Sequence, residues 1–77
     1  MTEIDARGLL CPLPVLRLRK TLMSRRKGDI VLLIATDRMA AVDVPHFCTG
    51  AGHRLLSVTE GENGEYRFQV ECGTQPV

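Results

Sequence analysis

The stretch Ile30-Val31-Leu32-Leu33-Ile34-Ala35 is the longest uninterrupted apolar run in the 77-residue chain. A short run of β-branched and aliphatic residues with a polar residue on either side is typical of a strand buried on both faces. Asp29 precedes the run, and Thr36 follows it. The run therefore predicts the central strand of a sheet, and it is far shorter than the roughly 20 residues of a membrane-spanning helix.

The segment before this strand predicts an amphipathic helix that starts at Pro12–Pro14 and continues for three to four turns, up to Gly28. Proline is tolerated in the first turn of a helix, where its missing N–H has no partner to lose. Basic residues at 25–27 suit the negative end of the helix dipole. The apolar side chains fall within one arc at about 100° per residue: Val15, Leu16, Leu18, Leu22 and Met23.

Residues 3–7 predict a short first strand, with Ile4 and Ala6 on one face, and Gly8 then supplies the backbone freedom for a turn. Downstream, residues 39–51 predict a second, broken helix. Asp43 is its expected N-cap, with a proline just inside the main turn. Glycines at 50 and 52 end the helix.

The last third of the chain predicts a hairpin. Residues 53–60 form one strand, Asn63-Gly64 is a strong hairpin turn signal, and a second strand alternates apolar with polar residues. The apolar set is Tyr66, Phe68, Val70 and Cys72, and the polar set is Arg67, Gln69 and Glu71.

The resulting order βαβαββ predicts an α/β (α+β) fold, a two-layer sandwich with two helices on one face of a four-stranded mixed sheet. The other face is left open to its polar side chains. Hydrophobic residues make up 44% and charged residues 25% of the chain, which argues against a disordered or fibrous protein. We expect residues 1–77 to form a single domain with a loose tail at 74–77.

The net charge of +1 argues against nucleic-acid binding by overall charge alone. The charge is uneven, because residues 1–28 hold seven basic and two acidic residues, whereas residues 29–77 hold three and seven. The N-terminus lacks a basic-then-apolar secretion signal, so we expect a cytoplasmic protein.

Cys11 stands between the turn at Gly8 and the predicted helix start. A helix N-terminus carries about half a positive charge, and thiols there or near basic side chains have lowered pKa values. We therefore predict that Cys11 is partly thiolate at neutral pH, and that Gly8, Pro12 and Pro14 hold it on a rigid mount. The alternative is a small buried hydrophobe, since free cysteines are often buried.

The other chemically active residues have structural interpretations. Cys72 follows the core alternation of its strand, and Cys48 has apolar neighbours, so both are expected in the core. Three cysteines without a CxxC pair predict neither a disulfide framework nor a structural metal site. His46 and His53 match no ligand spacing. We predict no metal and no cofactor.

The basic side chains of the first helix are candidate contacts for an anionic partner. Arg7, Arg17 and Lys20 are expected near the helix start that carries the thiol, where they could steer an anion or a sulfur donor. Arg19 falls inside the apolar arc, either because its stem lies along the surface or because it has a role of its own. The alternative for the whole set is a solvated face.

Cys11-Pro12-Leu13-Pro14 is a C-P-x-P motif, and the chain around it resembles the small sulfur-carrier proteins of the TusA/SirA type. One departure is Arg38, where many members have proline after the aspartate. The likeness extends over about residues 4–72 and includes four blocks, namely Asp5–Pro14, Arg19–Thr21, Asp43–Cys48 and Gly52–His53.

This resemblance implies a βαβαββ fold and a sulfurtransferase that acts as a persulfide shuttle on Cys11. A cysteine desulfurase or a rhodanese would load the thiol, and the sulfur would pass to an acceptor protein in tRNA thiolation, molybdenum-cofactor enzymes or sulfur oxidation. Membranes and nucleic acids are not expected partners.

Two alternative functions remain open from the sequence. One is a non-enzymatic module that binds protein or RNA through the basic helix. Few aromatic residues and a near-neutral charge weaken its RNA version. The other is a redox protein in which Cys48 resolves a sulfenic acid on Cys11.

Overall fold

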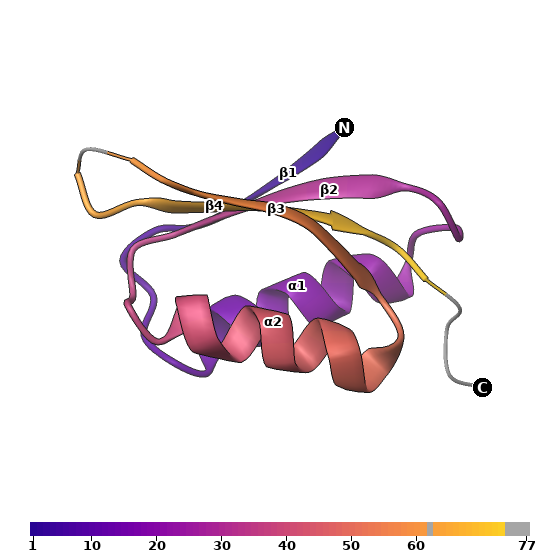
Figure 1. Ribbon diagram of the computed structural model, residues 1–77, viewed down its shortest axis with the longest axis horizontal. Helices are drawn as coiled ribbons and strands as arrows, with labels where there is room; N and C mark the ends of the chain where they lie inside the picture. Colours follow the sequence, from indigo (N-terminus) through magenta and orange to yellow (C-terminus); the bar gives the residue numbers. More distant parts are fainter. Residues whose placement is uncertain (62, 74–77) are drawn as a thin grey trace.

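The computed structural model describes residues 1–61 and 63–73, and it shows a sheet packed on two helices (Figure 1). The predicted tail at 74–77 lies outside the described residues. The order βαβαββ and the two-layer fold are confirmed. The elements are β1 (Thr2–Ala6), α1 (Leu13–Met23), β2 (Ile30–Ala35), α2 (Ala40–Ala51), β3 (Arg54–Glu60) and β4 (Tyr66–Glu71).

The four strands form one mixed sheet in the order β1-β2-β4-β3. β1 runs parallel to β2, with Ile4 opposite Leu33, whereas β4 runs antiparallel to both β2 and β3. β2 therefore has a neighbour on each side, as its unbroken apolar sequence predicts. The hairpin is also confirmed, since Gly61 N–H donates to the Glu65 carbonyl at 2.7 Å and Gly64 has φ +74°.

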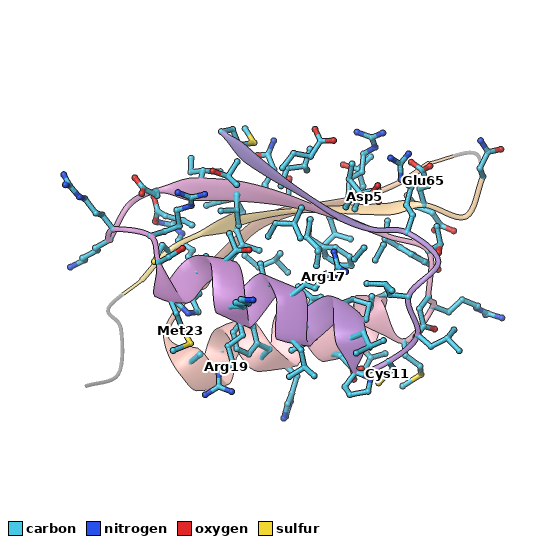
Figure 2. All side chains as sticks on the ribbon, turned by 180° about the vertical axis from the view of Figure 1, so that it is seen from behind. Asp5, Cys11, Arg17, Arg19, Met23 and Glu65 are labelled. Atoms are coloured by element: carbon cyan, nitrogen blue, oxygen red, sulfur yellow. The ribbon has the colours of Figure 1, made fainter. Side chains whose placement is uncertain are left out.

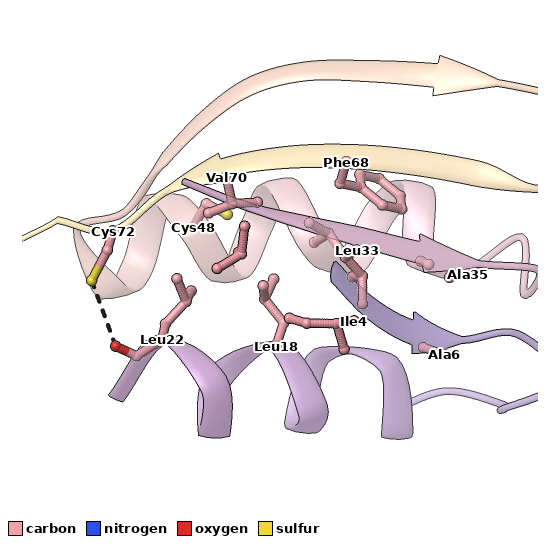
Figure 3. Close-up of a cluster of buried hydrophobic side chains, with 13 residues drawn as sticks. Ile4, Ala6, Leu18, Leu22, Leu33, Ala35, Cys48, Phe68, Val70 and Cys72 are labelled. Carbon is pink, nitrogen blue, oxygen red and sulfur yellow. Dashed lines mark hydrogen bonds between the residues drawn. The ribbon is translucent and has the colours of Figure 1, made fainter. Parts of the chain in front are cut away.

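The core lies between the sheet and the two helices, which cover the same face (Figures 1 and 3). Alternate strand residues point into it, as period-two patterning requires. Phe68 is the largest fully buried side chain. The core side chains shown around it in Figure 3 include Ile4, Leu18, Leu22, Leu33, Cys48, Val70 and Cys72.

The opposite sheet face carries the expected polar side chains and one buried apolar residue. Ile34 is only 2% exposed and lies in register between Asp5 of β1 and Arg67 of β4. Arg7 pairs with Asp5 at 3.0 Å and with Glu65 at 3.5 Å, and Arg67 pairs with Glu65 at 3.4 Å. Hydrogen bonds from Arg7 lower the pKa of the Asp5 carboxyl.

α1 begins where the prolines predict and ends earlier than expected. Its last residue is Met23, because Ser24 turns the chain and its hydroxyl donates to the Thr21 carbonyl at 2.9 Å. The buried side of α1 is narrower than the predicted apolar arc. Leu18 and Leu22 are fully buried, whereas Leu16 and Met23 are exposed, so only part of the predicted apolar arc faces the core.

α2 is continuous, so the predicted break in it was wrong. Pro45 lies inside the helix, and Met39 rather than Asp43 occupies the N-cap position. The helix starts four residues earlier than an Asp43 cap would allow, which leaves the Asp43 carboxylate free for another contact. Gly52 ends the helix in the left-handed conformation with φ +81°, a position that suits glycine.

His53 is a buried structural residue at the end of α2. Its Nδ1 accepts the Gly73 N–H at 2.9 Å, and its ring lies 5.6 Å from that of Phe47. Burial lowers the pKa of His53 below its ordinary value. The neutral imidazole is the form that can accept this hydrogen bond.

The stability of the protein should therefore fall in mild acid. The unfolded chain protonates His53 at a higher pH than the folded chain does, so the free energy of unfolding is highest above the unfolded pKa of about 6.5 and decreases as the pH falls below it. Urea unfolding at pH 7.5 and at pH 5.5 measures the decrease. His53→Gln should lose most of it, and the exposed-site control His46→Gln should keep it. Equal pH dependence in wild type and His53→Gln would contradict this assignment.

Candidate functional site

Cys11 is exposed, whereas Cys48 and Cys72 are buried. It stands at the end of the loop that joins β1 to α1, at the end of α1 opposite Met23 (Figure 2). Gly8 shapes this loop with φ +79°, and its N–H donates to the Thr36 hydroxyl at 2.8 Å. The predicted turn at Gly8 is therefore present, and it brings Cys11 to the surface.

The prolines that flank Leu13 hold the start of α1. The Cys11-Pro12 peptide bond is cis, and the Pro12 carbonyl accepts the Leu16 N–H at 3.1 Å. Pro14 is buried within the first turn. Leu13 N–H donates to the Leu10 carbonyl at 2.8 Å, which closes a turn around Cys11.

Two carboxylates contact Cys11. Because β1 and β2 are parallel, their carboxyl ends meet at one edge of the sheet, and this brings Asp37 beside the β1–α1 loop. Asp37 Oδ2 accepts the Cys11 N–H at 2.6 Å, and Asp43 Oδ2 accepts the Cys11 thiol at 2.8 Å. One carboxylate thus fixes the backbone of Cys11 and the other holds its sulfur.

The predicted thiolate character of Cys11 is wrong for the isolated chain. The hydrogen bond to Asp43 raises the pKa of the Cys11 thiol, with smaller contributions from partial burial and from the charges of Asp43 and Asp37. A neighbouring negative charge disfavours a second one, and a hydrogen bond from the thiol favours its protonated form. These contacts therefore favour the thiol form of Cys11 over the thiolate.

An apolar surface surrounds Cys11. An open pocket of about 440 Å³ lies between the two helices, and its lining consists of Cys11, Pro12, Val15, Asp43, His46 and Phe47. Large exposed apolar side chains stand next to these residues in the chain, namely Leu10, Leu13 and Val42. The thiol is thus presented on a partly apolar surface of the kind that mediates protein contacts.

The basic candidates lie outside this pocket. Arg7 is engaged by Asp5 and Glu65 on the open face of the sheet. Arg17 and Lys20 line a second depression with Ile4 and Thr21. Figure 2 shows Arg17 on the sheet side of α1 and Arg19 pointing away from the sheet. The structure therefore gathers none of these four side chains around Cys11.

The two remaining cysteines are core residues, as predicted. Burial raises the pKa of Cys48 to about 11. The Cys72 thiol donates to the Leu22 carbonyl at 3.5 Å, and the dashed line in Figure 3 marks this contact. The burial of Cys48 argues against a resolving thiol. Within residues 1–61 and 63–73, no cluster of three or more histidine, cysteine, aspartate or glutamate residues is placed to hold a metal ion.

The sequence interpretation missed both carboxylates of the site. The position of Asp37 follows from parallel pairing of the first two strands, so a topological argument could have placed it near the thiol. Asp43 was interpreted as a helix cap, and its contact with sulfur depends on where α2 begins. Only the structure shows that the Asp43 carboxylate contacts the Cys11 thiol.

Known proteins with a similar sequence or a similar fold were compared with this chain. Residues 2–72 match the family described as Sulfurtransferase TusA. Two proteins of Neisseria meningitidis, from serogroups A and B, are each 40% identical over 68 residues, which is 88% of this chain and 90% of theirs, and both are named as candidate sulfur carriers. The crystal structure of a SirA-like protein from Desulfitobacterium hafniense superposes with a TM-score of 0.83 at 27% identity, covering 96% of this chain and all of that one.

Proposed function

Because this chain belongs to the TusA sulfurtransferase family, we propose that it carries sulfane sulfur as a persulfide on Cys11 and relays it between partner proteins. The observation that carries this proposal is the exposure of Cys11 on a braced helix start while both other cysteines are buried. A relay must present its sulfur to two different proteins in turn, and an accessible sulfur at the end of a small domain is suited to that.

The transfer is an exchange between a thiol and a persulfide. The Cys11 sulfur attacks the outer sulfur of a cysteine persulfide on the donor protein, so that one S–S bond forms and the donor's S–S bond breaks. The donor's cysteine leaves with the proton that Cys11 gives up. Delivery repeats the exchange with the acceptor's thiol as nucleophile, so the cycle needs no oxidant or reductant.

Donor and acceptor are proteins with reactive cysteines. We assign the donor to the cysteine desulfurases or the rhodaneses, and the acceptor to a protein of tRNA thiolation, molybdenum-cofactor enzymes or sulfur oxidation. The chain acts as a sulfurtransferase in the manner of a shuttle, and we place the exchange in the cytoplasm. No helix in the described part of the chain has the length and apolarity to cross a membrane.

The partner contacts extend beyond the sulfur. We propose that the partner protein covers the exposed apolar side chains around Cys11 during transfer. Gly8, Pro12 and Pro14 keep the Cys11 sulfur in its position while the partner is bound. Arg17, Arg19 and Lys20 offer an additional contact along α1 for an acidic partner surface. Arg7 contributes less, because Asp5 and Glu65 already neutralise it.

Loading tests the proposed function. The reduced protein is incubated with a cysteine desulfurase and cysteine, and separately with a rhodanese and thiosulfate, and its intact mass is then measured. We expect a gain of one sulfur atom from at least one donor and its loss on treatment with a reductant. The donor that works identifies the supply route.

The loading experiment also separates the alternatives. If the wild-type protein gains no sulfur from either donor, the carrier proposal fails, and a binding module that uses the basic helix becomes the better description. An oxidant-dependent disulfide between Cys11 and Cys48 would instead favour the redox function.

A further inference from the structure

We propose that Asp43 sets the sulfur occupancy of Cys11: its carboxylate stabilises the sulfur-free thiol over the persulfide anion, so that the carrier releases sulfur readily instead of retaining it. This inference rests on the proposed function and adds a second residue to its chemistry. It assigns Asp43 a catalytic role, because Asp43 Oδ2 touches the reacting sulfur at 2.8 Å.

The charge of Asp43 is available to act on the sulfur. Within the described residues, the ion pairs that form are those of Arg7 and Arg67, and none of them includes Asp43. Asp37 already accepts the Cys11 N–H and, through Oδ1, the Met39 N–H at 3.2 Å. His46 is the other titratable side chain that lines the pocket. Asp43 is therefore the charged group in direct contact with the thiol.

Loading moves one proton through this contact. As the Cys11 sulfur bonds to the outer sulfur of the donor's persulfide, its proton passes to Asp43 Oδ2. The donor's S–S bond breaks, its electron pair stays on the donor's cysteine, and that thiolate takes the proton from Asp43. The transferred sulfur keeps its own proton at first, and its ionisation releases that proton to water.

The carboxylate then faces an anion where it had faced a neutral thiol. Persulfides are more acidic than the corresponding thiols, so the loaded form carries a negative charge near Asp43 at neutral pH. Like charges close together disfavour the ionised form, and the hydrogen bond to the S–H group is lost with its proton. Both effects raise the free energy of the loaded state relative to the unloaded state and favour delivery to an acceptor.

Alkylation of the unloaded protein tests the electrostatic part without any sulfur donor. Iodoacetamide reacts with thiolates, and peptide mass analysis assigns the product to Cys11. Asp43→Asn should raise the rate at pH 7 by about fivefold, the equilibrium factor for two unit charges about 4 Å apart in bulk water. Glu3→Gln is the matched control, because it removes one exposed negative charge on β1 and should leave the rate unchanged.

Competition for sulfur tests the occupancy itself. Persulfidated wild-type protein, labelled with nitrogen-15, is mixed anaerobically with unlabelled Asp43→Asn in its thiol form, and intact masses are followed until the distribution is constant. The reverse mixture verifies equilibrium. We expect sulfur to accumulate on Asp43→Asn by about fivefold, whereas a mixture of wild type and Glu3→Gln should share it equally.

The two measurements distinguish this inference from the proposed function. An equal distribution of sulfur, or an alkylation rate that Asp43→Asn does not change, would overturn the role of Asp43 while leaving Cys11 as the carrier. A wild-type protein that accepts no sulfur would instead remove the proposed function, and the alkylation result would still report on the contact. Circular dichroism verifies that the variant is folded, and Asp43→Ser provides a second variant without the carboxylate.

Discussion

Phe68→Ala should lower the free energy of unfolding by about 3–5 kcal/mol, the usual cost of removing a buried phenylalanine side chain. Phe68 is fully buried at the centre of β4, in register with Leu33 on one side and Val58 on the other. A domain of this size has a total stability of about 4–12 kcal/mol. The substitution should therefore leave a substantial unfolded fraction at 37 °C.

Urea unfolding followed by circular dichroism measures this loss. Leu16→Ala is the matched control, because Leu16 is a large apolar residue that is 47% exposed on α1. Its substitution should change the free energy of unfolding by about 0.5 kcal/mol. Similar losses in the two variants would contradict the assignment of Phe68 to the centre of the core.

Cys11→Ser should abolish sulfur acceptance while leaving the fold intact. Serine keeps the size and a hydroxyl donor for Asp43, but its oxygen cannot form a persulfide. Because Cys11 is exposed, its substitution removes no core contact. Transfer of radioactive sulfur from labelled cysteine through a desulfurase, detected on a non-reducing gel, should label the wild type and not this variant.

Cys48→Ala is the matched control for that experiment. Its sulfur is buried between α2 and the sheet, and burial raises its pKa to about 11, which leaves very little thiolate at neutral pH. The variant should accept as much sulfur as the wild type, with a modest loss of stability from the small cavity. Labelling of the Cys11→Ser variant, or loss of labelling in the Cys48→Ala variant, would show that the sulfur is not carried by Cys11 alone.

The fold was predictable from local patterns because each element agrees with its surroundings. The apolar run at Ile30–Ala35 corresponds to an interior strand, and the alternation from Tyr66 to Cys72 corresponds to a strand with one covered face. Helix bounds were less predictable, since they depend on tertiary contacts. α1 ends at Met23, and two carbonyls of its last turn accept hydrogen bonds from outside the helix. The Ser24 hydroxyl donates to the Thr21 carbonyl, and the Cys72 thiol donates to the Leu22 carbonyl.

The exposure of Cys11 was predictable from the sequence, and the charges that surround its thiol were not. Gly8, Pro12 and Pro14 fix the local backbone around Cys11, and this local sequence signal predicts that its sulfur is exposed. The sign of its pKa shift depends on Asp37 and Asp43, which are 26 and 32 residues away in the chain. A positive environment was inferred from basic residues nearby in sequence, whereas the actual contacts come from Asp37 in the loop between β2 and α2 and from Asp43 in the first turn of α2.

Mapping the added sulfur in the loaded wild-type protein identifies the cysteine that carries it. Loading from a desulfurase is followed by alkylation of all sulfur groups, proteolysis and mass measurement of the three cysteine-containing peptides. We predict one additional sulfur atom on the peptide that contains Cys11 and none on those that contain Cys48 or Cys72. Additional sulfur on either of the buried cysteines, with Cys11 unmodified, would rule out Cys11 as the carrier.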